Sequence, residues 1–113
     1  MNLKIDILGT KYTISEKTPE QDSYLNRCDG YCDKTTKTIV IKKKMPDSEL
    51  GDFEVYRRKV IRHEIIHAFL FESGLHENFH HDAWGHDETM IDWIAVQFSK
   101  LRKAFEEAGC LES

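Results

Sequence analysis

Two histidines and a glutamate lie close together near the middle of the chain, as His63, Glu64 and His67. The segment around them, 60–70, is rich in apolar residues and contains no proline or glycine, which predicts a helix. Residues four apart lie on one face of a helix, so both imidazoles could bind one zinc ion at about 2.0–2.1 Å. Glu64 is rotated by about 100° from His63, beside the metal rather than on it. There it could take a proton from a zinc-bound water molecule, whose pKa the metal lowers to about 7.

The same residues could instead belong to an ordinary buried helix without a metal. A single buried imidazole needs only one or two hydrogen-bond partners, so that interpretation suits a lone histidine. Here it would bury two imidazoles and a carboxylate together, and an unpaired buried charge is costly. A metal site is therefore the better interpretation of the motif.

A catalytic zinc site needs a third protein ligand and an open position for water. The metzincin pattern, with glycine and histidine three and six residues after His67, is excluded because leucine and serine occupy those positions. Glu88 is the favoured third ligand, since it lies at the expected start of the next long helix, as in gluzincin-like sites. His86 and Asp92 remain alternatives, and Asp92 is better placed to accept a hydrogen bond from a ligating imidazole.

The N-terminal part of the chain is strand-like. Leu3, Ile5 and Ile7 alternate with other residues, and a Gly-Thr pair separates them from a second such segment, 11–15, which predicts a β-hairpin. A second hairpin is predicted with 28–32 as one arm and the β-branched segment 38–42 as the other. The two hairpins are expected to form a small antiparallel sheet.

Two long helices are predicted after the hairpins. The first runs from about Phe53 to Ser73, with Gly74 in the left-handed conformation beyond its end, and carries the motif in its second half. The second begins near 87–88 and ends at Gly109. Five residues spaced by three or four form its apolar face, which is expected to pack on the core: Ile91, Ile94, Phe98, Leu101 and Phe105. The chain is thus expected to be a single α+β domain spanning 1–113.

Composition excludes several classes of protein. The formal net charge of −4 provides no positive surface for nucleic acid. No segment approaches the ~20 apolar residues of a membrane span. The three cysteines are an odd number, which argues against a disulfide framework and favours a cytoplasmic protein.

The segments HEIIHAFLFESGL and ETMIDWIAVQFSKL, together with the Gly-Tyr-Cys-Asp arm and the strand before the first helix, resemble small phage- and prophage-encoded zinc metallopeptidases. These look like minimal zincins, similar to the peptidase domain of repressor-cleaving and radiation-response regulators. The resemblance covers about 29–101. It implies a small α+β fold, with His63, His67 and Glu88 as zinc ligands and Glu64 as general base. It also implies an edge strand that could hold an extended substrate peptide.

Two functions are compatible with these observations. The first is a zinc-dependent peptidase that acts on a peptide or protein in the cytoplasm, which is the host cytoplasm if the gene is phage-encoded. Its oxyanion donor could be Tyr31, His81 or His86. The alternative is a non-catalytic protein in which zinc stabilises a small core and the surface binds a partner. A structural zinc has four protein ligands and a catalytic zinc three, so the ligand count distinguishes the two.

Overall fold

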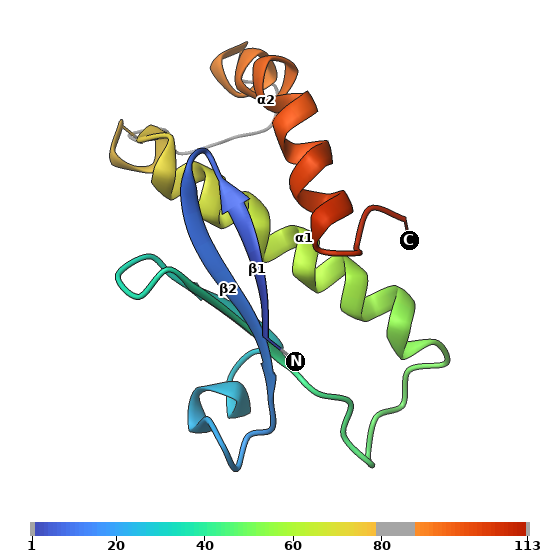
Figure 1. Cartoon of the computed structure of the whole chain (residues 1–113). Coiled ribbons are helices and arrows are strands. Elements are labelled where there is room, and N and C mark those ends of the chain that lie inside the picture. The colour runs from blue at the N-terminus through green and yellow to red at the C-terminus, as the bar shows by residue number, and fades with distance from the viewer. Residues whose placement is uncertain (1, 79–87, 113) are drawn as a thin grey trace.

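A computed structural model of the chain describes residues 2–78 and 88–112, and its elements follow the predicted order (Figure 1). They are β1 (Asn2–Ile7), β2 (Thr10–Lys17), β3 (Gly30–Asp33), β4 (Thr38–Lys42), α1 (Phe53–Glu72) and α2 (Glu88–Glu107). Short 3₁₀ turns occur at Ser23–Asn26 and Leu75–Asn78. A small sheet with two long helices is an α+β fold, which confirms the predicted class.

Both predicted hairpins form. β1 and β2 pair antiparallel across a two-residue turn, in which Leu8 and Gly9 have φ angles of 51° and 94°. Two successive positive φ angles match the twist of the flanking strands, which favours such a tight turn. β3 and β4 also pair antiparallel, and the Asp33 carboxylate accepts a hydrogen bond from the Thr35 backbone N–H at 2.9 Å in the turn between them.

The sheet is mixed, so the prediction of a wholly antiparallel sheet is wrong at one junction. The strand order is β1-β2-β4-β3, and β2 pairs with β4 in parallel. This order puts the most β-branched strand, β4, in the interior of the sheet, where Ile39, Val40 and Ile41 are buried. It also leaves β3 at one edge and β1 at the other.

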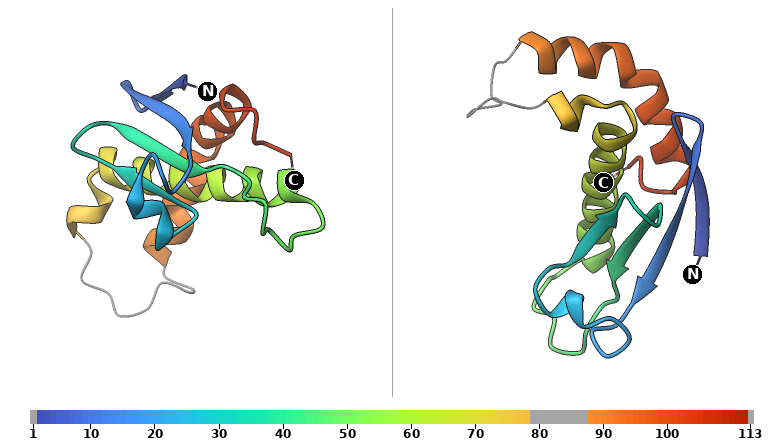
Figure 2. Two further views of the ribbon diagram at one scale, coloured as in Figure 1. Left: turned by 90° about the horizontal axis from the view of Figure 1, so that it is seen from below. Right: turned by 90° about the vertical axis from the view of Figure 1, so that its left-hand side faces the viewer.

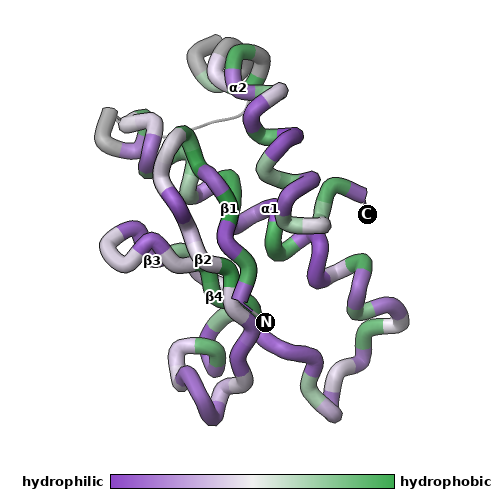
Figure 3. Tube along the Cα trace, in the orientation of Figure 1, coloured by the Kyte–Doolittle hydropathy of each residue, from purple (hydrophilic) through white to green (hydrophobic). Residues whose placement is uncertain are grey.

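Helix α1 covers one face of the sheet (Figures 1 and 2). Every second residue of β1 contributes to the interface, which includes Ile5 and Ile7, and the alternation of hydrophobic and hydrophilic residues along this strand can be followed in Figure 3. From the helix, Ile61, Ile65 and Phe69 pack into the same core. Apolar residues thus recur at every second position of the strand and at every third or fourth position of the helix, and both sets face the same apolar layer.

Polar contacts at both ends of α1 hold it on the sheet. Near its start, the Arg57 guanidinium forms an ion pair with Glu16 of β2. Near its end, the Glu72 carboxylate accepts hydrogen bonds of 2.7 Å from the Tyr12 hydroxyl and from the Lys37 ammonium. The helix therefore has a defined position relative to β2 and the β3–β4 turn.

The termini of α1 agree with the predicted signals. Its N-cap is Asp52, whose side chain accepts a hydrogen bond from the backbone N–H of Val55 at 3.3 Å. Its C-cap is Ser73, and Gly74 follows with φ 81°, in the left-handed region that glycine adopts without strain. These bounds place the motif in the second half of the helix.

Helix α2 packs on the core through only part of the face predicted for it, since Leu101 and Phe105 contact the core as expected. Ile94 and Phe98 are 46% and 60% exposed, whereas Leu101, Ala104 and Ala108 are buried. Ala104, and Ala108 just beyond the helix, are small and let the C-terminal half of α2 lie close to α1 and β1. Their apolar signal in the sequence is weak, so the periodicity favoured larger side chains instead. The expectation that Ile94 and Phe98 pack on the core is therefore wrong.

Neither helix is long and apolar enough, across 2–78 and 88–112, to cross a membrane.

Candidate metal centre

His63 and His67 project from one side of α1, and their Nε2 atoms lie 3.2 Å apart. Two ligands of a tetrahedral zinc ion, each at about 2.0–2.1 Å from the metal, are separated by about 3.3 Å. The imidazole nitrogens are therefore already spaced as two corners of a zinc tetrahedron, and they fit a metal without a change in the helix backbone.

The surroundings favour the neutral, metal-binding form of one imidazole. The pKa of His67 is lowered from its usual 6.5, first by burial and then by the nearby His63 and His76. A neutral imidazole has the free lone pair that a metal requires. His76, in the 3₁₀ turn after α1, also packs against Phe71 with ring centroids 4.7 Å apart.

Glu64 differs from the exposed His63 and His67 because its side chain is buried, with only 6% of the residue's surface exposed. Burial disfavours the charged carboxylate and raises the pKa of Glu64 from 4.5 to about 7. Its charge acts on the Cys32 thiol of β3, whose own pKa is raised to about 12, mainly by burial. A carboxylate between α1 and the edge strand with a pKa near neutrality is suited to accept and return a proton.

Hollows flank the motif on both sides along β3. One, of about 310 Å³, lies between the start of β3 and α1, beside Glu64 and His63. The other, of about 610 Å³, lies between the end of β3, Phe71 and His76. An extended chain that follows β3 would therefore pass the two imidazoles with room for side chains on either side.

Among the described residues, the edge of β3 that faces away from β4 pairs with no other strand, and it lies beside these hollows. The backbone N–H of Lys42 donates to the Asp29 carbonyl at 2.9 Å, and Gly30 is aligned with Ile41. Since residues of an antiparallel pair alternate between bonded and non-bonded positions, the N–H and C=O of Gly30 and Cys32 point away from β4. They are positioned to pair with an added strand.

Gly30 is a residue of this site that the sequence analysis missed. A Cβ atom on Gly30 would lie 3.0 Å from Val60 Cγ1 and 3.1 Å from the Val40 carbonyl oxygen. The absence of a side chain thus lets β3 approach α1 closely, four residues before Glu64. A glycine near the start of a predicted strand is no signal of close packing by itself, so only the three-dimensional structure shows this role.

The structure brings together three of the predicted site residues, His63, Glu64 and His67. Among the side chains described, no third metal-binding group joins the histidines. Glu88 is the first residue of α2, but its side chain and that of Asp92 lie outside the described part of the structure.

Other predicted candidates lie elsewhere or are not described. His81 and His86 fall in 79–87, outside the described residues. The Tyr31 hydroxyl, a candidate oxyanion donor, donates a hydrogen bond to the Asp22 carboxylate. Its availability to a substrate would require that bond to open.

Comparison with protein-family models, curated proteins and solved structures finds no match for this chain, so its function has to be argued from the geometry of the site.

Proposed function

We propose that this protein is a zinc-dependent peptidase. The observation that carries the proposal is the pair of imidazole nitrogens 3.2 Å apart, next to a buried glutamate on the same helix. Two histidines provide imidazole nitrogen ligands, which suit zinc. The carboxylate provides the proton acceptor that hydrolysis needs.

The roles of the chain's own residues follow from their positions. His63 and His67 would bind the metal in their neutral forms. A zinc ion bound there would polarise the scissile carbonyl and make a water molecule more acidic. Glu64 would take a proton from the attacking water and donate it to the leaving nitrogen. Burial of Glu64 raises its pKa toward neutrality, which supports its role in both transfers.

The free edge of β3 supports an extended polypeptide as substrate. A peptide paired with the outward N–H and C=O groups of Gly30 and Cys32 would form one more strand of the sheet. The hollows at the two ends of β3 would receive its side chains. The backbone pairing would thus present a peptide carbonyl to the two histidines.

Glu88 remains the proposed third ligand. Trp93, in the second turn of α2, packs against Phe69 with ring centroids 6.5 Å apart, and its indole N–H donates to Ser73 Oγ at 3.3 Å. These contacts bring the first half of α2 to the end of α1 that carries His67. These contacts support a ligand from the start of α2, and Glu88 is the carboxylate that the sequence provides there.

Replacement of the proposed base tests this function. Glu64→Gln should retain zinc, measured by elemental mass spectrometry, because Glu64 is not a ligand. It should lower cleavage of a random peptide library, followed by mass spectrometry, by at least about 10²-fold, the lower end for loss of a general base. Glu54→Gln is the matched control, since Glu54 is exposed on the first turn of the same helix. Equal cleavage by Glu64→Gln and wild type, or no cleavage by the zinc-loaded wild type, would reject the proposal.

A further inference from the structure

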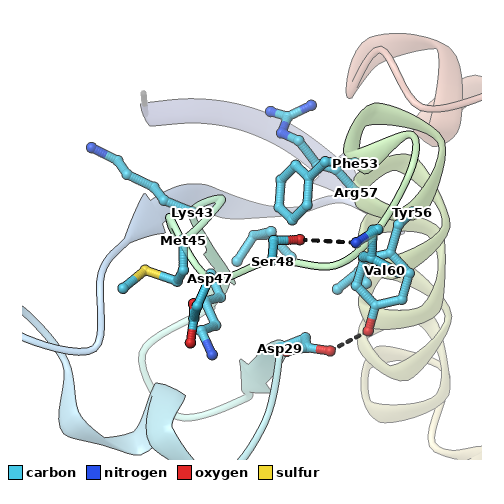
Figure 4. Close-up of a pocket in the computed structure, with 12 residues that line it drawn as sticks. Asp29, Lys43, Met45, Asp47, Ser48, Phe53, Tyr56, Arg57 and Val60 are labelled. Carbon is cyan, nitrogen blue, oxygen red and sulfur yellow. Dashed lines mark hydrogen bonds between the residues drawn. The ribbon is translucent and has the colours of Figure 1, made fainter.

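A separate pocket lies at the start of α1, outside the proposed chemistry (Figure 4). We call it the β4–α1 pocket, because its walls come from the end of β4, the connection 43–52 and the first turns of α1. Its volume is about 300 Å³, at the lower end of the range for ligand pockets, with room for one large side chain. Its apolar lining consists of Ile41, Met45, Leu50, Phe53 and Val60.

The β4–α1 pocket is continuous with the groove beside the metal centre. Asp29, Tyr56 and Val60 line both the pocket and the hollow that contains His63 and Glu64. The Tyr56 hydroxyl donates a hydrogen bond to the Asp29 carboxylate, and this pair forms the boundary between the two spaces (Figure 4). A chain that lies along β3 and leaves the metal centre in this direction reaches the pocket next.

The charges around the pocket do not favour a charged occupant. Lys42 and Lys43 line it together with Asp29 and Asp47, so positive and negative groups are balanced. Arg57 also lines the pocket, but its guanidinium is paired with Glu16 of β2. The pocket can therefore select its occupant through apolar contacts and not through charge.

The distance between the pocket and the metal centre can be expressed in substrate residues. The α1 residues of the pocket are centred near 56–57 and the two histidines near 65, which is about 13 Å at a rise of about 1.5 Å per residue. An extended chain advances about 3.3 Å per residue, so this distance corresponds to about four residues.

We propose that the β4–α1 pocket binds a large apolar side chain, such as leucine, methionine or phenylalanine, of the polypeptide substrate, about four residues from the cleaved bond. The identity of the occupant rests on the peptidase function proposed above. The pocket itself is defined by residues that have no part in metal binding or proton transfer.

Leu50 provides a suitable test position because its side chain is 46% exposed at the pocket, so that Leu50→Asp should not disturb the fold. Leu111→Asp is the matched control, since Leu111 is 39% exposed near the C-terminus and does not line the pocket. Both changes are made in the zinc-loaded Glu64→Gln variant, which serves as a binding protein that leaves peptides intact. Peptides of 12 residues retained from a random library are then sequenced, and the affinity of one selected peptide is measured by fluorescence anisotropy.

The parent and Leu111→Asp should enrich large apolar residues, whereas Leu50→Asp should lose the enrichment and bind the selected peptide about tenfold more weakly. Wild-type protein should cleave library peptides about four residues from such a residue. Equal selection by Leu50→Asp and Leu111→Asp, or no retained peptides in any variant, would overturn the inference. If Leu50-dependent binding occurs but the wild type cleaves nothing, the pocket stands and the peptidase proposal fails. If the wild type cleaves library peptides with no preference for a large apolar residue about four residues from the cleaved bond, the peptidase stands and the pocket assignment fails.

Discussion

The arrangement of the three motif residues follows from one property of a helix. Residues at i and i+4 share a face, so His63 and His67 meet at 3.2 Å, while Glu64 turns toward the edge strand and becomes buried. The same short segment therefore provides an exposed pair of imidazole nitrogens and a buried carboxylate with a raised pKa.

Removal of either imidazole should remove the metal. His63→Ala and His67→Ala should each lower zinc content sharply from about one ion per chain, because two ligands at most would remain. Each change should also lower the melting temperature of the zinc-loaded protein, since metal binding stabilises the folded state. His76→Ala is the control, because that histidine lies near the motif but is not proposed as a ligand. Full zinc content in the His63→Ala/His67→Ala double variant would show that the motif binds no metal.

The third ligand can be identified by comparing acidic residues of α2 with a histidine before it. Glu88→Ala should weaken zinc binding more than Asp92→Ala, because loss of a ligand costs more than loss of a group that only orients one. Loss of an orienting group typically weakens metal binding by 10–100-fold. Competition with a chromophoric zinc chelator measures each affinity. A site emptied by His86→Ala and left filled in Glu88→Ala would assign the ligand to the histidine instead.

At the scale of elements, the separation between β3 and α1 sets the width of the groove. Gly30→Ala would place a methyl group 3.0 Å from Val60 Cγ1, in contact with both strand and helix. Overpacking of this kind typically costs about 1–3 kcal/mol, so chemical denaturation should show a lower free energy of unfolding. Gly51→Ala is the matched control, since a Cβ there meets no atom within 4 Å. Equal stability of Gly30→Ala and Gly51→Ala would show that this close approach is not required.

The sequence predicted those elements whose signals are local. Gly74 follows the end of α1 and Gly9 lies in the first hairpin turn, and each acts through its own neighbours in the chain. The parallel pairing of β2 with β4 could not be predicted in this way, because it joins strands that are not consecutive. The buried face of α2 was predicted only in part, since Leu101 is buried as expected but Ile94 and Phe98 are exposed. Neighbouring faces of α2 carry either large exposed residues such as Phe98 or small buried residues such as Ala104. The sequence shows both faces as apolar, and only packing on the core distinguishes them.

At the scale of the whole molecule, Glu72 joins three separate parts of the chain. It lies at the end of α1 and accepts hydrogen bonds from Tyr12 of β2 and from Lys37 of the β3–β4 turn. The buried Tyr12 ring is also packed within the core, and its hydroxyl pKa is strongly raised, first by burial and then by Glu72. The position of the motif over the sheet therefore depends on a carboxylate five residues beyond His67.

The charge of Glu72 should make part of the stability depend on pH. The pKa of Glu72 is lowered from 4.5, first by the hydrogen bond from Lys37 and also by that from Tyr12. A lowered pKa in the folded state means that the carboxylate stabilises the protein at pH values above 4.5 and ceases to do so as the pH falls through the lowered pKa. Glu72→Gln removes the charge but keeps a hydrogen-bond acceptor, so we expect it to lower the free energy of unfolding at pH 7 by roughly 1–2 kcal/mol. This loss of stability should become smaller in acid, where the wild-type carboxyl is itself neutral. Urea denaturation at a series of pH values from 7 downward measures it.

Glu106→Gln, which breaks an exposed pair with Arg102, is the control and should change stability little at any of these pH values. A deficit for Glu72→Gln that stays constant as the pH falls would mean that the shape of the side chain, and not its charge, connects α1 to the sheet.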